Sequence, residues 1–297
     1  MPKVFYSNSI NKRHYNKVIW TADEDRQLRE MFSSVMPNDL IDHFGLTYEQ
    51  IRTRARTLKL NSKKTVRRNN LNQKLFSDVT IESSYWAGFL MADGCIGKNN
   101  IWIGLSAKDK SHLEKFASAL RLVDAVRCYS SVAGGILKNR KYERAILDVT
   151  SNELVDSIQK NFNVLPQKTL KPYIPPKIIK GDYAKAFIAG LIDGDGFINI
   201  YENGNYIRFG FIGSEGLCKW AANCINAELN KLGRKATAYV KKPEKRSYWE
   251  IRCSGFNAQI ILNHMQMICG ELLLNRKWEK LKIFNSQKVW QKDKTKS

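Results

Sequence analysis

The sequence has few of the residues that build metal clusters or disulfide frameworks. Its four histidines stand in unrelated contexts, and none of its six cysteines shows the paired spacing of a zinc site. The scattered histidines argue against a metal centre built from imidazoles. Because no secretory signal precedes the cysteines, we expect reduced thiols in an intracellular protein. The expected location is the cytoplasm or the nucleoid, with an organelle as the alternative.

Long apolar runs are also missing, and acidic residues are outnumbered. The most apolar stretches, near residues 85–92 and 187–192, are much shorter than the roughly 18 residues that span a bilayer. We therefore expect no membrane-spanning helix. The chain has 49 Lys and Arg against 28 Asp and Glu, a formal net charge of +21. Such an excess favours a polyanionic partner, above all nucleic acid, with a basic solvated surface as the alternative.

Two stretches, Tyr85–Gly94 and Phe187–Gly196, share one pattern. Each is an apolar run that predicts a helix and ends on Asp-Gly. Small residues stand four apart in both copies, which places them on one face of the helix: Gly88 and Ala92 in the first, Gly190 and Gly194 in the second. Two helices packed along these faces would bring their C-terminal ends side by side.

The acids that end the two copies, Asp93 and Asp195, are the candidate metal-binding and catalytic residues. Each precedes a glycine suited to the left-handed conformation that ends a helix. Two carboxylates at two negative helix ends invite a divalent cation, and Mg²⁺ commonly adds waters and phosphate oxygens to one or two carboxylates. One Asp-Gly after an apolar run is usually only a turn, so the recurrence favours a site. Asp193 carries less weight because Met91 is its counterpart.

The segments Trp86–Gly94 and Ile188–Gly196 resemble the two signature helices of the LAGLIDADG homing endonucleases, in the single-chain form with two repeats. The first copy departs from the family at three positions, Trp86, Phe89 and Met91. The resemblance implies a sequence-specific endonuclease that cuts both strands of DNA across the minor groove with Mg²⁺ or Mn²⁺. It also implies that the last acid of each motif is catalytic and binds metal, here Asp93 and Asp195.

The family usually places a lysine in each repeat near the scissile phosphate. The segments Pro166–Thr169 and Asn275–Trp278 resemble those places. The resemblance therefore assigns Lys168 and Lys277 to the catalytic centre, with Arg276 as an alternative in the second repeat and a surface lysine as the alternative for either.

Two other functions suit the same fold. One is an RNA maturase that assists intron splicing, and the other is a non-catalytic DNA-binding regulator. The presence of both acids favours cleavage. Since one chain holds two repeats, we expect a monomer that binds double-stranded DNA.

The elements predicted after each motif follow the same order. Each repeat, at 81–180 and 181–290, reads helix, two strands, helix, two strands, helix, so we expect an α+β fold of two pseudo-symmetric αββαββα units. Strand alternation gives each sheet an apolar face and a polar face, as in the strand predicted over 235–241. The polar face could be only the solvated side of a sheet.

In the family the two sheets form a saddle that reads bases in the major groove. The resemblance therefore implies candidate readers on the polar faces: Trp102, Arg127, Tyr129, Arg144 and Asp148 in the first repeat, and Asn199, Tyr201, Arg208, Thr237, Tyr239, Lys241, Tyr248, Glu250 and Arg252 in the second.

Residues 18–60 predict three helices, over Ala22–Val35, Pro37–Phe44 and Tyr48–Lys59. Thr47 and Gln50 predict a capping box at the start of the third. The pattern resembles a Myb-like helix-turn-helix domain whose third helix enters a groove of DNA, with a plain three-helix bundle as the alternative. Basic residues expected to contact DNA are Arg52, Arg54, Arg56 and Lys59 on that helix, and Lys63, Lys64, Arg67 and Arg68 in a basic linker over 61–80.

Overall fold

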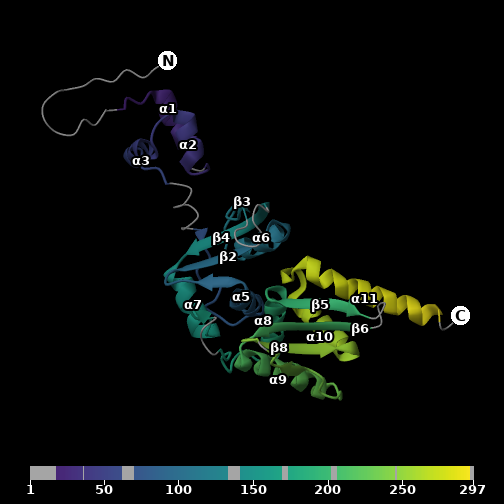
Figure 1. Ribbon diagram of the computed structural model, residues 1–297. Helices are drawn as coiled ribbons and strands as arrows, with labels where there is room; N and C mark the ends of the chain where they lie inside the picture. Colours follow the sequence, from purple (N-terminus) through teal and green to yellow (C-terminus); the bar gives the residue numbers. More distant parts are fainter. Residues whose placement is uncertain are drawn as a thin grey trace. The chain divides into compact units, whose positions relative to one another are not determined.

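The computed structural model describes residues 18–35, 37–61, 70–132, 141–168, 173–201, 206–244 and 246–294, and omits the side chains of 130–132, 141–142 and 288–294. The predicted DNA contacts of Lys63, Lys64, Arg67 and Arg68 lie outside these residues. The chain divides into two compact units, Met1–Leu71 and Asn72–Ser297, each considered by itself (Figure 1).

The N-terminal unit contains the three predicted helices, α1 (Ala22–Met31), α2 (Pro37–Phe44) and α3 (Tyr48–Thr57). The predicted capping box of Thr47 and Gln50 is present at α3. Two helices are shorter than predicted, because turns follow Met31 and Lys59 takes a left-handed conformation. The buried core consists of Leu28, Phe32, Leu40, Phe44, Leu46, Ile51 and Ala55.

The larger unit contains the two repeats in the predicted order (Figure 1). The first has α5 (Ile81–Ala92), β1 (Gly94–Ile96), β2 (Asn100–Ser106), the short helix η1 (Ala107–Asp109), α6 (Lys110–Ala119), β3 (Arg127–Val132), β4 (Lys141–Thr150) and α7 (Asn152–Phe162). The second has α8 (Asp182–Asp193), β5 (Gly196–Tyr201), β6 (Tyr206–Gly213), α9 (Glu215–Lys231), β7 (Tyr239–Lys241), β8 (Trp249–Ser254), α10 (Gly255–Cys269), η4 (Gly270–Leu272) and α11 (Asn275–Lys294).

Each repeat forms one four-stranded antiparallel sheet, in the orders β1-β2-β4-β3 and β5-β6-β8-β7. This confirms the predicted α+β class. Alternation also places the faces as expected, since Ile207, Phe209 and Phe211 of β6 are fully buried while Arg208 between them is half-buried. Among the described helices, none combines the length and apolar character needed to cross a bilayer.

The signature helices α5 and α8 pack side by side at the centre of the unit, as predicted (Figure 1). A Cβ added to Gly88 would overlap the carbonyl oxygen of Phe187, and one added to Gly190 would overlap that of Tyr85. A Cβ at Gly194 would overlap the methyl group of Ala92. Gly88 and Gly190 are therefore required by backbone contact between the two helices, and Gly194 by contact with the Ala92 side chain.

One predicted strand is shorter than expected. The ladder predicted over 235–241 forms only at Tyr239–Lys241. Upstream, the amide of Asn226 in α9 replaces the neighbouring strand: its Oδ1 accepts from the backbone N–H of Thr237 at 3.1 Å and of Ala238 at 2.9 Å. A side chain thus satisfies backbone groups that a longer β7 would have paired.

The linker predicted over 61–80 ends earlier than expected. The backbone N–H of Asn72 donates to the carbonyl of Leu120 at 2.9 Å, and Asn161 donates to the carbonyl of Phe76 at 2.8 Å. The Phe76 side chain is itself fully buried. Residues from Asn72 onward therefore belong to the folded repeats.

Candidate active site and nucleic-acid interface

The two candidate acids lie just beyond the ends of α5 and α8. Asp93 is the C-terminal cap of α5, whereas α8 ends at Asp193 and Asp195 follows two residues later. The expectation that the second helix continues to Asp195 is therefore wrong. Asp93 is half-buried and Asp195 is exposed.

The glycines after these acids serve a purpose other than the predicted one. Gly94 and Gly196 do not have positive φ angles; they begin β1 and β5. A Cβ at Gly94 would lie 2.7 Å from the carbonyl oxygen of Leu90, and one at Gly196 would lie 2.8 Å from that of Ile192. Glycine is needed at both positions because the strand leaves the helix against its own last turn.

The two acids interact electrostatically. Burial, and after it the negative charge of Asp195, raise the pKa of Asp93 to about 6, against the opposing charges of Lys277 and Lys168. Asp195 is therefore near enough for its charge to act on Asp93. A pair of mutually repelling carboxylates favours a bound cation.

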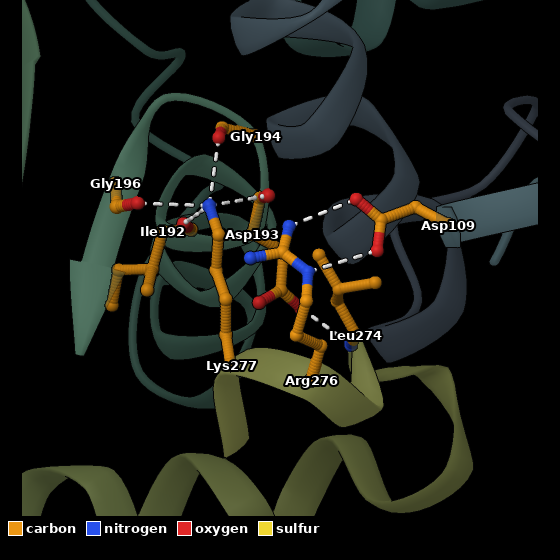
Figure 2. Close-up of polar contacts among 8 residues, drawn as sticks. All are labelled: Asp109, Ile192, Asp193, Gly194, Gly196, Leu274, Arg276 and Lys277. Atoms are coloured by element: carbon orange, nitrogen blue, oxygen red, sulfur yellow. Dashed lines mark hydrogen bonds and ion pairs between the residues drawn. The ribbon is translucent and has the colours of Figure 1, made fainter. Parts of the chain in front are cut away.

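Lys168 and Lys277 occupy equivalent positions at the ends of the two signature helices. Lys168 Nζ donates to the carbonyls of Met91 at 2.5 Å and Ala92 at 2.7 Å. Lys277 Nζ lies 2.7–2.8 Å from four carbonyl oxygens, those of Ile192, Asp193, Gly194 and Gly196 (Figure 2). Each ammonium group thus meets carbonyls that lack helical partners.

Burial is the main influence on both ammonium groups. It lowers the pKa of Lys168 to about 8, while Asp195 and Asp93 act in the opposite direction. Burial likewise lowers the pKa of Lys277, opposed by Asp193 and Asp93. Both lysines are therefore linked electrostatically to the acids at the helix ends.

Asp193 is fully buried and saturated with donors, unlike Asp195. Its carboxylate accepts from the hydroxyl of Tyr85 at 2.6 Å, the backbone N–H of Leu274 at 2.9 Å and Nε1 of Trp278 at 2.8 Å. Burial raises its pKa to about 6 although these hydrogen bonds act to lower it. The geometry gives Asp193 a structural position between the repeats.

Arg276, the alternative to Lys277, points elsewhere. Its guanidinium group donates to both carboxylate oxygens of Asp109 in η1, at 3.0 and 2.8 Å (Figure 2). Sequence reasoning missed Asp109 and also Lys115 of α6, which donates to the carbonyl of Leu273 at 2.8 Å. Their partners lie far away along the chain, so no local pattern could have indicated these contacts.

A metal site here would depend on the two acids and on ligands from outside the protein. Within the described ranges no group of three or more His, Cys, Asp and Glu side chains is placed to hold an ion. The pair Asp93 and Asp195 nevertheless suits Mg²⁺ or Mn²⁺, since Mg²⁺ sites commonly use one or two carboxylates and complete the shell with water and phosphate.

The polar face of the first sheet combines aromatic and basic side chains. Register places Trp102 opposite Asp148, and Tyr129 opposite Arg144. The guanidinium carbon of Arg144 lies 5.8 Å from the centre of the Trp102 ring, and that of Arg127 lies 6.0 Å from that of Tyr129. These predicted readers therefore share one face and support each other through cation–π contacts.

The polar face of the second sheet has the same character. The guanidinium carbon of Arg208 lies 4.8 Å from the ring centre of Tyr201, which stacks on Tyr206. Arg208 also donates to Ser254 Oγ at 2.8 Å. Asn199 on the neighbouring strand accepts from Lys280 of α11 at 2.8 Å.

Other predicted readers of this sheet bond to each other. Glu250 is buried, pairs with Arg252 and lies 3.9 Å from Lys241. Tyr239 stands opposite Arg252 and is exposed, and Tyr248 is half-buried. Asn257 donates to the hydroxyl of exposed Thr237 at 3.0 Å. Glu250 thus offsets part of the positive charge of this face.

The basic residues of α3 are not equivalent. Arg56 and Lys59 are exposed, and Arg52 is an exposed partner of Glu49 at 3.6 Å. Arg54 instead donates through Nε to Asp25 of α1 at 2.7 Å, and through a second nitrogen to the other oxygen. Arg54 therefore joins α3 to α1.

No family model matches the chain, and no curated protein matches it. Among solved structures, similarity is found to the I-SmaMI LAGLIDADG homing endonuclease bound to cleaved DNA, at 12% identity and a TM-score of 0.40, covering 71% of this chain and 90% of that one.

Two other solved structures show a comparable similarity. The homing endonuclease I-WcaI bound to its DNA recognition sequence gives 12% identity and a TM-score of 0.45, over 69% of this chain and 87% of that one. Full-length DUF199/WhiA from Thermatoga maritima gives 12% identity and a TM-score of 0.39, over 73% of this chain and 64% of that one.

Proposed function

We propose that this chain is a metal-dependent, sequence-specific endonuclease that cuts both strands of double-stranded DNA and acts as a monomer. The observation that supports this best is the position of Asp93 and Asp195 at the ends of the packed helices α5 and α8, with one lysine bonded to each end. The same unit has two sheets whose polar faces are rich in arginine and aromatic side chains.

The acids and the lysines would have different roles in catalysis. Asp93 and Asp195 would hold Mg²⁺ or Mn²⁺, which when bound activates water and stabilises charge on the leaving oxygen. Lys168 and Lys277, which bond to the carbonyls at the two helix ends, would supply positive charge to a scissile phosphate beside the acids. Because Asp195 is exposed, the centre is reachable from solvent.

The polar sheet faces would bind the DNA on either side of the cut. Arginine and tyrosine can contact base edges and phosphates, so positions such as Arg144 and Arg208 would select the site. Exposed basic residues of α3 would add contacts through a helix-turn-helix arrangement. The net charge of +21 suits such a partner.

The proposal is tested by offering the full chain a randomised duplex library with Mg²⁺ and sequencing the cut ends. We expect one enriched site with short 3′ overhangs. Asp93→Asn and Asp195→Asn should each abolish double-strand cleavage and leave binding of the selected site largely intact. Near-normal cutting by either variant would falsify the catalytic assignment. Specific DNA binding without cleavage would identify a regulator, and preferential binding of intron RNA a maturase.

A further inference from the structure

The segment that carries Lys277 is held by the opposite repeat. Residues Leu273–Trp278 lead from η4 into α11 of the second repeat. Lys115 of α6, in the first repeat, donates to the carbonyl of Leu273 at 2.8 Å and to Oδ1 of Asn275 at 3.1 Å. The residues on the N-terminal side of Lys277 are therefore bonded across the repeat boundary.

A second contact across the repeat boundary is the ion pair of Arg276 with Asp109. The Arg276 side chain is 57% exposed, whereas that of Asp109 is only 10% exposed. Both oxygens of the buried acid accept from the guanidinium group, at 3.0 and 2.8 Å. A two-point pair of this kind fixes direction as well as distance. Because a buried carboxylate is costly without its partner, Asp109 favours one placement of Arg276.

A third anchor holds the same segment from the interior. Asp193 accepts from the backbone N–H of Leu274 and from the indole of Trp278, and its remaining donor is Tyr85 of the first repeat. Figure 2 shows the result: Arg276 points to η1, while the neighbouring Lys277 points into the turn after α8. Lys277 thus lies between anchors on both sides.

The first repeat has no matching ion pair at the equivalent positions. Gln167 precedes Lys168 as Arg276 precedes Lys277, but Gln167 is exposed. Asp109 follows the end of β2 as Gly216 follows the end of β6, and Gly216 has no side chain to accept a bond. A Cβ at Gly216 would lie 2.9 Å from the carbonyl oxygen of Tyr173. Among the residues that the structure describes, Lys277 is therefore flanked by such an ion pair and Lys168 is not.

We propose that Asp109 and Lys115 of the first repeat are positioning residues for Lys277 of the second, acting through Arg276 and the backbone of Leu273–Trp278. The geometric part concerns the folded chain alone. Its consequence for cleavage rests on the function proposed above. We call the contacts of Asp109 and Lys115 with residues 273–278 the clamp. Loosening the clamp should slow the cutting of one DNA strand and spare the other, because Lys168 is held separately.

The geometric part is tested by competitive labelling of lysines with an amine-reactive reagent on the full chain, followed by mass spectrometry. Lys168 is the internal reference, so the measured quantity is the labelling of Lys277 relative to Lys168. In Arg276→Gln and Asp109→Asn we expect this ratio to rise about fivefold, since local opening follows the loss of the contacts that oppose it. Arg276→Lys keeps the charge but not the two-point geometry, so an intermediate ratio is expected.

A matched control removes an ion pair at the other end of α8. Lys185 pairs with Glu228 at 3.0 Å and its side chain is 13% exposed. Lys185→Gln should leave the labelling ratio unchanged. Arg276 is more than half exposed, so its variants keep the test valid even where Asp109→Asn fails to fold. An unchanged ratio in Arg276→Gln, or an equal rise in Lys185→Gln, overturns the proposal.

Cleavage gives the second readout. On a selected site, Arg276→Gln should accumulate nicked DNA, with one strand cut about tenfold more slowly and the other at the rate of the unaltered chain, as expected for a displaced catalytic group. Equal slowing of both strands contradicts strand-specific positioning. If the unaltered chain cuts no DNA, the proposed function fails, while the labelling ratio still decides whether the clamp exists.

Discussion

Tyr85 of α5 donates its hydroxyl proton to Asp193 of α8 at 2.6 Å, and so bonds the two repeats to each other inside their shared interface. The Tyr85 oxygen also lies 3.1 Å from Nε2 of buried His112. Since the Tyr85 proton is directed to Asp193, we infer that His112 Nε2 is the donor in this second bond. One acid of the second motif therefore belongs to a buried network, while Asp195, two residues later, faces solvent.

Asp193→Asn should damage stability more than chemistry. An amide offers one acceptor oxygen where the carboxylate meets three donors, so a buried group is left unpaired at a cost of about 1–3 kcal/mol. We expect a lower midpoint of thermal unfolding and, well below that midpoint, cleavage that exceeds that of Asp195→Asn. Equal loss of cleavage in the two variants at a temperature where both are folded would show that Asp193 is the catalytic acid.

His112 should make the fold sensitive to acid. Burial lowers its pKa from 6.5 to about 3, so the folded chain keeps the imidazole neutral where the unfolded chain binds a proton. Stability attributable to His112 is therefore lost as pH falls from about 6.5 toward 3, with a slope of at most about 1.4 kcal/mol per pH unit. Asp193, with its pKa raised to about 6, acts in the opposite direction.

His112→Phe separates the contribution of His112 to the pH dependence of stability from that of the buried acids. Nδ1 of His112 has no hydrogen-bond partner among the described residues, so a phenyl ring of similar shape removes only the bond to Tyr85. Denaturant unfolding gives the free energy of unfolding at several pH values. As pH falls below 6.5, this free energy should decrease less in the variant than in the unaltered chain. A difference between the two proteins that stays constant from neutral pH to pH 4 would contradict a buried neutral imidazole.

Added bulk between the signature helices should separate the repeats. Gly190→Leu and Gly88→Leu place a side chain where the backbones of Tyr85 and Phe187 already lie. Overpacking of this kind costs at least about 1–3 kcal/mol and should lower the midpoint of thermal unfolding. Ser118→Leu adds the same bulk at an exposed position of α6 and should change the midpoint little. An unchanged midpoint in both glycine variants is the outcome that contradicts the close contact.

The sequence predicted the repeats because their physical causes are local. Small residues four apart and strand alternation repeat within a few positions, so α5, α8 and both sheets could be placed. The purpose of Gly94 and Gly196 was predicted wrongly, because the backbone that crowds each one becomes visible only when strand and helix are assembled. The shortening of β7 has the same origin, since Asn226 competes for its backbone from another element.

The site shows the same division between local and distant causes. Lys168 and Lys277 could be indicated by resemblance, and the structure places both ammonium groups at the ends of α5 and α8. The contact of Asp109 with Arg276 could not be predicted, because it depends on how two repeats dock and has no counterpart in the first repeat. The roles of these residues in cleavage stay predictions.

The N-terminal unit should extend the DNA contact beyond one end of the site without taking part in the cut. A chain that begins at Asn70 keeps the buried Phe76, unlike one that begins at Asp78. It should cleave the same phosphates with weaker binding, a shallower salt dependence and a footprint shortened on one side, because the lost contacts are largely electrostatic.

Side-chain variants separate binding from folding within that unit. Arg52→Ala and Arg56→Ala together remove exposed charge and should reproduce most of the loss in affinity and footprint. Arg54→Ala removes the partner of Asp25 and should instead lower the stability of the three-helix unit.

Footprinting of the shortened and full chains decides whether the N-terminal unit contacts DNA. An identical protected region would make the unit a structural or protein-binding module, and loss of cleavage at saturating enzyme would mean that it supports the active fold.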